Sequence, residues 1–208
     1  KPILILAPTQ RCGTTLLQRA INCGGNTAIY GENFFLCEDY PELLGNPVYK
    51  YEAKLNLTKA IEEEFFNGNR GVDATAFFPD YQQYCRATLS SFYTILQHYD
   101  CYSKSKNLLH WGFKHQVQNL NGFKNFISLL PGFCSVTLYR DLVDVAKSYR
   151  ARWPQMLSST SQIKQIGERW GKNLEFMKGL KNNHICSYED LISDYYAASY
   201  KISEHTGV

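Results

Sequence analysis

Short apolar runs alternate with longer amphipathic segments along the chain. The apolar runs, rich in β-branched and aromatic residues, predict strands at residues 2–7, 28–31, 108–113, 134–139 and 184–188. Apolar residues at helical spacing predict helices at 14–23, 58–66, 81–98, 121–129, 142–151, 162–179 and 190–205. Because strands alternate with helices, we expect an α/β fold of three layers, in which helices cover both faces of a central, mostly parallel sheet of about five strands.

The chain has 208 residues, which suits a single domain, residues 1–208, with a full hydrophobic core. The distance between the second and third expected strands is long, and we interpret residues 33–107 as a helical insertion. The many Tyr and Phe residues of this insertion favour core packing of extra helices. Alternatively, some of them form the wall of an acceptor pocket, because insertions at the carboxyl edge of a sheet often form the variable part of a site.

Composition and charge exclude several classes of protein. The chain is 44% hydrophobic and 20% charged, as in an ordinary globular protein, and its net charge of +3 includes no Lys/Arg-rich run that would suggest nucleic-acid binding. No apolar stretch is long enough to span a bilayer, and no signal-peptide pattern occurs. The seven cysteines have no metal-ligand spacing, and their odd number favours a reducing compartment such as the cytoplasm. The Golgi lumen is the alternative if an anchor precedes the chain.

A polar turn joins the first expected strand to the first expected helix. Backbone N–H groups and the helix dipole at such a turn attract anions. Compared with the ATP-binding pattern GxxxxGK[ST], Gly13 keeps its place, but Thr14 replaces the lysine and Pro8 replaces the first glycine. Arg11 is the only cation of the turn. The turn therefore suits a phosphate-like group but lacks the lysine that reaches the β- and γ-phosphates of ATP.

A second phosphate motif follows the fourth expected strand. Arg140 lies at the carboxyl end of that strand, and Ser148 lies eight residues later, about two turns into the next helix. Ligands of open α/β sheets bind at this end of the strands, so Arg140 could bind a phosphate bidentately and Ser148 could donate its hydroxyl. Alternatively, Arg140 pairs with Asp141 or Asp144 at the surface, and Ser148 is an ordinary helix residue.

Both motifs resemble those of sulfotransferases, enzymes that use 3′-phosphoadenosine 5′-phosphosulfate (PAPS) as sulfuryl donor. Residues 11–16, RCGTTL, are similar to the 5′-phosphosulfate loop, commonly RSGTT or KSGTT, with Cys12 in place of the usual serine. Arg140 and Ser148 resemble the 3′-phosphate motif in type and spacing. The segment YEDL, which begins at Tyr188, is also common in the family. The resemblance extends over residues 2–208 and is weakest at 36–107.

The resemblance implies a P-loop-like fold and in-line sulfuryl transfer to an acceptor hydroxyl, with 3′-phosphoadenosine 5′-phosphate (PAP) as product and no metal. Glu32, soon after the second strand, stands where related protein-tyrosine and carbohydrate enzymes have a glutamate base. Lys114 stands at a strand end where related enzymes often carry a lysine near the bridging oxygen of the donor. The implied catalytic residues are therefore Glu32, Lys114 and Arg11. The implied nucleotide-binding residues are Arg11, Cys12, Gly13, Thr14, Thr15, Arg140, Ser148 and Tyr188.

A histidine is the competing base. Cytosolic sulfotransferases use a histidine in a Lys-Thr-His pattern, whereas Lys114 and His115 are adjacent here. Neighbouring residues of a strand face opposite ways, which disfavours a common site for the two side chains.

Two further functions remain compatible with the sequence, and the acceptor and the oligomeric state are not determined by it. A P-loop kinase or nucleotide hydrolase would need the missing lysine, and a non-catalytic nucleotide-binding module of the same fold is kept open by Cys12. The acceptor is a protein tyrosine, a carbohydrate or a small alcohol, and the residues around Glu32 favour the first two. The sequence does not indicate an oligomeric state.

Overall fold

The computed structural model describes residues 2–39, 41, 81–130, 132–157 and 159–208. The expected helix at 58–66, and most of the expected insertion at 33–107 with many of its aromatic residues, therefore lie outside the described residues.

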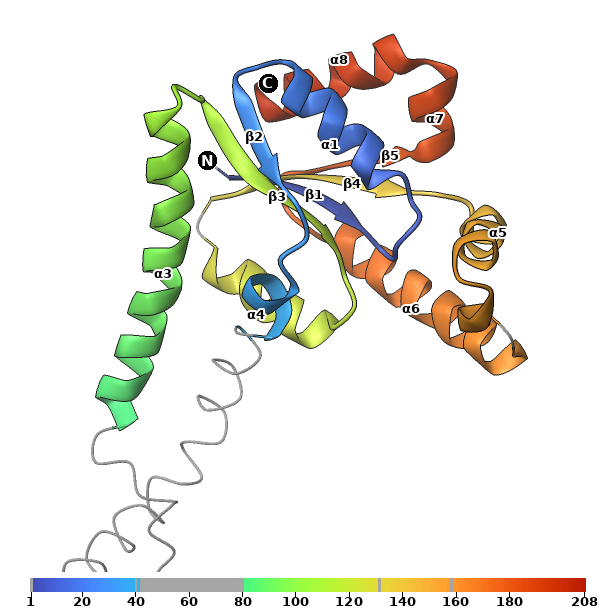
Figure 1. The fold of residues 1–208 in the computed structure, drawn as a ribbon, viewed down its shortest axis with the longest axis horizontal. Coiled ribbons are helices and arrows are strands. Elements are labelled where there is room, and N and C mark those ends of the chain that lie inside the picture. Colours follow the sequence, from blue (N-terminus) through green and yellow to red (C-terminus); the bar gives the residue numbers. More distant parts are fainter. Residues whose placement is uncertain (1, 40, 42–80, 131, 158) are drawn as a thin grey trace, which may run out of the picture.

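Five parallel strands form one sheet in the order β2-β3-β1-β4-β5 (Figure 1). The strands are β1 (Pro2–Ala7), β2 (Thr27–Tyr30), β3 (His110–Gln116), β4 (Cys134–Tyr139) and β5 (Asn183–Ser187). The sequence prediction is confirmed in fold class and in number of strands, and the sheet is entirely parallel. β3 differs most from its prediction, because the ladder with β1 continues through Lys114, His115 and Gln116, which pair with Ile5, Leu6 and Ala7.

Helices cover both faces of this sheet. Figure 1 shows α1, α7 and α8 on one face, and α3, α4 and α6 on the other. The helices are α1 (Thr14–Cys23), α3 (Tyr81–Ser105), α4 (Leu120–Leu129), α5 (Leu142–Arg152), α6 (Thr160–Lys178), α7 (Tyr188–Ser193) and α8 (Tyr195–Thr206), with short turns η1 (Phe35–Asp39) and η3 (Pro154–Leu157). The expected helix at 190–205 is two helices, because Asp194 ends α7 and its side chain caps α8 by accepting from the Ala197 N–H.

The core has two main parts that the central strand β1 separates. Successive side chains of a strand point to opposite faces. Leu4 and Leu6 therefore pack with the aromatic side chains of α3 and α4, whereas Ile3 and Ile5 pack with α1, α7 and α8. Burial on both faces explains why the first strand reads as an uninterrupted apolar run. This rigid centre fixes where the strand ends lie.

Candidate active site

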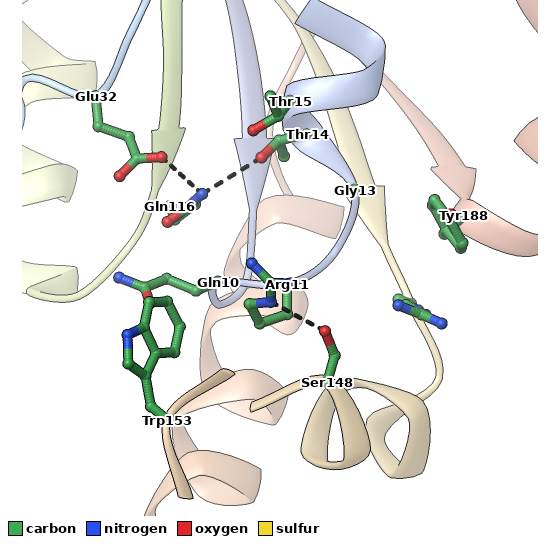
Figure 2. Close-up of a pocket in the computed structure, with 11 residues that line it drawn as sticks. Gln10, Arg11, Gly13, Thr14, Thr15, Glu32, Gln116, Ser148, Trp153 and Tyr188 are labelled. Carbon is green, nitrogen blue, oxygen red and sulfur yellow. Dashed lines mark hydrogen bonds between the residues drawn. The ribbon is translucent and has the colours of Figure 1, made fainter. Parts of the chain in front are cut away.

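A pocket of about 440 Å³ lies at the carboxyl edge of the sheet. Eight of the ten residues implicated by the sequence line it, and the two exceptions are Lys114 and Cys12. The pocket-lining residues, shown in Figure 2, are Gln10, Arg11, Gly13, Thr14, Thr15, Glu32, Gln116, Arg140, Ser148, Trp153 and Tyr188. The two sequence motifs and Glu32 therefore meet at one site.

The turn after β1 presents the amino end of α1 to the pocket. Gly13 is the N-cap of α1, and no side chain caps this helix end. Gly13 has φ +89°, and a Cβ there would lie 2.3 Å from the ring of Tyr188. Only glycine combines this backbone conformation with this close contact. An uncapped helix end keeps its first N–H groups available for an anion.

Glu32 and Lys114 form an ion pair beside this helix end. Lys114 Nζ lies 2.7 Å from Glu32 Oε1 and donates to Thr15 Oγ1 at 3.2 Å. The Lys114 side chain is only 9% exposed, whereas the Glu32 side chain is 26% exposed. Lys114 is therefore one contact away from the pocket surface, and Glu32 lies at that surface.

His115 lies away from this pocket. Its ring is fully buried and stacks on Phe123, and its Nε2 lies 2.7 Å from Glu38 Oε1. Glu38, also buried, accepts in addition from the backbone N–H groups of Gln118 and Asn119. This buried pair ties η1 to the loop after β3. As expected for neighbours in a strand, Lys114 and His115 occupy opposite faces of the sheet.

Arg140 packs against a tyrosine and retains an unpartnered donor. Its guanidinium lies 4.6 Å from the centre of the Tyr188 ring. Its Nε is buried and has no hydrogen-bond partner among the described residues; Glu189 Oε1, at 4.0 Å, is too far for a hydrogen bond. The two aspartates of the surface alternative have other partners: Asp141 caps α5, and Asp144 pairs with Lys147 at 3.0 Å.

Arg11 connects the two phosphate motifs. Its Nε donates to Ser148 Oγ at 3.0 Å, and its guanidinium lies 5.6 Å from the centre of the Trp153 ring. Figure 2 shows Arg11 and Ser148, both of which line the pocket, pointing toward one another. The side chain implied for the 5′ end of the donor thus also touches the residue implied for its 3′ end.

The structure places the Cys12 side chain in the core rather than in the pocket. Cys12 is fully buried and packs with Ala7, Val145 and Tyr149. Burial raises the pKa of its thiol to about 11, against a smaller lowering by hydrogen bonds to Thr9. Any contact of this position with a bound anion would therefore involve the backbone. The thiol of Cys12 does not line the pocket.

This burial predicts low thiol reactivity. A thiol with a pKa of about 11 stays protonated at pH 8, and only the thiolate is nucleophilic. We expect iodoacetamide at pH 8 to label the exposed Cys23 and Cys101 in the native protein and to label Cys12 only after denaturation. Peptide mass spectrometry at increasing times measures this order. Labelling of Cys12 as fast as that of Cys23 would contradict the buried placement.

Gln116 lines the pocket and contacts the predicted base, Glu32, directly, but it was not among the residues implicated by the sequence. Its Nε2 donates to Glu32 Oε1 at 2.8 Å and to Thr14 Oγ1 at 3.4 Å (Figure 2). The sequence contained a usable signal, because Gln116 lies two residues after Lys114 and so shares its strand face. This is also the place of the histidine in a Lys-Thr-His pattern. The prediction ended the strand too early, at residue 113.

The described residues contain neither a membrane-spanning helix nor a metal-binding cluster. None of the described helices combines the length and apolarity needed to cross a bilayer. Within the same part of the chain, no group of three or more His, Cys, Asp or Glu side chains could hold a metal ion.

The family of this chain follows from sequence comparison. Residues 2–208 match the model of the Sulfotransferase family, and the chain belongs to this family of enzymes. No curated protein sequence matches it.

Solved structures agree with the fold. The chain is similar to the sulfotransferase domain from the curacin biosynthetic pathway, with a TM-score of 0.58 and 15% identity over 99% of this chain and 74% of that one. It is also similar to the sulfotransferase domain from the Synechococcus PCC 7002 olefin synthase, with a TM-score of 0.57 and 14% identity over 100% of this chain and 74% of that one. At these identities the likeness concerns the fold alone.

Proposed function

We propose that this sulfotransferase moves a sulfuryl group from PAPS to an acceptor hydroxyl, with Glu32 as general base. The observation that carries the proposal is the position of Glu32, paired with Lys114, beside the uncapped amino end of α1. The support is that a carboxylate and a helix end able to attract an anion line the same pocket, with the Lys114 ammonium in contact with that carboxylate.

The pocket residues suit a donor with two anionic ends. The amino end of α1, with Gly13 at its cap, offers backbone N–H groups to the 5′-phosphosulfate. At the other end, Arg140 has a buried Nε without a partner in the part of the chain that the structure describes, a donor that a 3′-phosphate would satisfy. Ser148 accepts from Arg11, and its own hydroxyl proton remains available for the same phosphate. ATP lacks this 3′-phosphate.

The side chains of this site have distinct tasks in the proposed reaction. The bound donor supplies a sulfur atom whose bond to the 5′-phosphate oxygen breaks, with its electron pair, as the acceptor oxygen bonds to sulfur. Glu32 takes the proton of the acceptor hydroxyl. Lys114 donates a hydrogen bond to the leaving oxygen, and Arg11 and the backbone of Thr14 and Thr15 stabilise the negative charge that develops. A sulfuryl group carries less charge than a phosphoryl group, so the proposal includes no metal.

A protein tyrosine or a carbohydrate is the acceptor that we propose. The support is the resemblance of the residues around Glu32 to enzymes that act on these acceptors. A panel containing a tyrosine peptide, an oligosaccharide and a small alcohol, assayed with the same PAPS concentration, measures the preference. Exclusive transfer to the small alcohol would contradict this part of the proposal.

Thermal unfolding with nucleotides tests the donor. A ligand at one hundred times its Kd stabilises the folded state by about 2.7 kcal/mol. For a protein of this size that corresponds to a rise in Tm of about 5–10 °C. We expect this rise with PAP and a smaller one with ATP and Mg²⁺ at the same concentration. A larger rise with ATP and Mg²⁺ would favour the kinase or hydrolase. PAP binding without sulfate transfer to any acceptor would favour the non-catalytic module.

A further inference from the structure

The Glu32 carboxylate is held through one of its two oxygens. Oε1 accepts from Lys114 Nζ at 2.7 Å and from Gln116 Nε2 at 2.8 Å. Among the described residues, Oε2 has no hydrogen-bond partner. The two donors thus restrain the side chain and leave one carboxylate oxygen available at the pocket surface.

The Gln116 side chain makes two contacts through its amide Nε2, while its buried Oε1 has no hydrogen-bond partner among the described residues. It is 7% exposed, and its Nε2 also contacts Thr14 Oγ1 at the first residue of α1. The orientation of the amide follows from its partners, because a carboxylate oxygen accepts and only the NH₂ group can donate. The reversed amide would direct a carbonyl oxygen at the carboxylate. Gln116 therefore links the predicted base to the anion-binding helix end.

The two hydrogen-bond donors to Glu32 have different roles in the proposed reaction. Lys114 carries a positive charge, and the developing charge on the leaving oxygen attracts it away from Glu32. The Gln116 amide is neutral, and its contacts give it no role at the leaving oxygen that would draw it away from Glu32. The amide can therefore keep Glu32 in place when Lys114 turns to the donor.

We propose that Gln116 is a positioning residue that holds Glu32 through Oε1 while Lys114 serves the leaving group. The inference rests on the proposed function, because it assumes that Glu32 is the base. It adds a residue that acts through Glu32 and does not itself take a proton. The competing explanation is that Gln116 only fills space at the end of β3.

The test compares Gln116→Met, similar in length but without an amide, with Gln165→Met, an exposed glutamine of α6, as matched control. We expect Gln116→Met to lower kcat by about 10- to 100-fold, the scale of a lost hydrogen bond to a charged group. The KM for PAPS and the Kd for PAP should change by less than about twofold, because the donor contacts remain. Gln165→Met should behave as wild type. Wild-type kcat in Gln116→Met would overturn the proposal.

Combination with Glu32→Gln separates positioning from packing. If Gln116 acts only through Glu32, adding Gln116→Met to Glu32→Gln lowers the remaining kcat by less than about twofold, because effects of residues that act as a unit are not additive. The proposal would be overturned if the kcat losses of the two single variants multiplied fully in the double variant. It would also be overturned if Gln116→Met weakened PAP binding by the same factor by which it lowered kcat. These outcomes differ from a failure of the proposed function itself, in which Glu32→Gln alone keeps its turnover.

Gln116→Glu provides a second variant with nearly unchanged shape. At neutral pH its carboxylate would face that of Glu32, and like charges at this distance repel. We expect a loss of kcat at least as large as in Gln116→Met, with the calorimetric Kd for PAP measured on the same sample to show that the fold persists. Activity equal to wild type would contradict a donor role for position 116 even if Gln116→Met fails to fold.

Discussion

Replacing Glu32 by glutamine is expected to lower kcat by about 10²- to 10⁴-fold, the usual contribution of a general base. The amide cannot take a proton at neutral pH, but its oxygen can still accept from Lys114 and Gln116 as Oε1 does now. The pocket should therefore keep its shape. Initial rates of PAP release at saturating PAPS and acceptor measure the effect.

Two controls show whether the lower kcat of Glu32→Gln reflects loss of the base. The Kd for PAP, determined by calorimetry, should stay within about threefold of the wild-type value, because no proposed phosphate contact involves Glu32. Glu168→Gln, a change of the same type at an exposed site on α6, should leave turnover unchanged. Turnover of Glu32→Gln close to that of the wild type would exclude Glu32 as the base.

The sequence predicted the centre of the sheet well because strands such as β1 and β4 are buried. β1 is buried on both faces, so its apolar run needs no periodicity to be recognised as a strand. The turn at Gly13 was equally readable, because a strand, a polar turn with glycine and a helix together predict an anion site. Such local signals place the two phosphate motifs, and the parallel topology then brings strand ends to one edge.

Non-local pairing explains what the sequence did not reveal. The polar residues from Lys114 to Gln116 do not read as a strand, yet they pair with β1 and are buried. That pairing places Gln116 beside Glu32, which lies 84 residues away in sequence. The contact between Arg11 and Ser148 likewise joins residues 137 positions apart. Residue spacing places Gln116 on the strand face of Lys114, but it does not identify Glu32 as the partner of Gln116.

The sequence also does not indicate which way a side chain points within a turn. The family resemblance implied Cys12 as a nucleotide-binding residue, but its side chain turns into the core between α5 and β1. A turn has no fixed periodicity, so the direction of a side chain within it depends on the backbone dihedral angles of its neighbours. Arg11, with φ +70°, lies in the left-handed region.

Replacing Arg140 by alanine is expected to weaken PAP binding by about 10- to 150-fold, or 1.5–3 kcal/mol, the scale of a lost hydrogen bond to a charged group. The guanidinium already packs on Tyr188, so little side-chain freedom remains to be lost on binding. Its buried Nε lacks a partner among the described residues, and binding of a phosphate oxygen would remove that desolvation cost. Calorimetry with PAP measures the change in Kd.

A ligand without the 3′-phosphate distinguishes the loss of a 3′-phosphate contact from a general effect of the lost positive charge. Adenosine 5′-monophosphate lacks the 3′-phosphate, so Arg140→Ala should change its Kd by less than about threefold, and the difference between the two ligands is the coupling energy. Arg150→Ala, which removes an exposed charge from the last turn of α5, should affect both ligands equally and weakly. An equal loss for PAP and for the monophosphate in Arg140→Ala would place the guanidinium elsewhere than at the 3′ end. Arg140→Lys should recover only part of the affinity, because an ammonium cannot bind a phosphate bidentately as a guanidinium does.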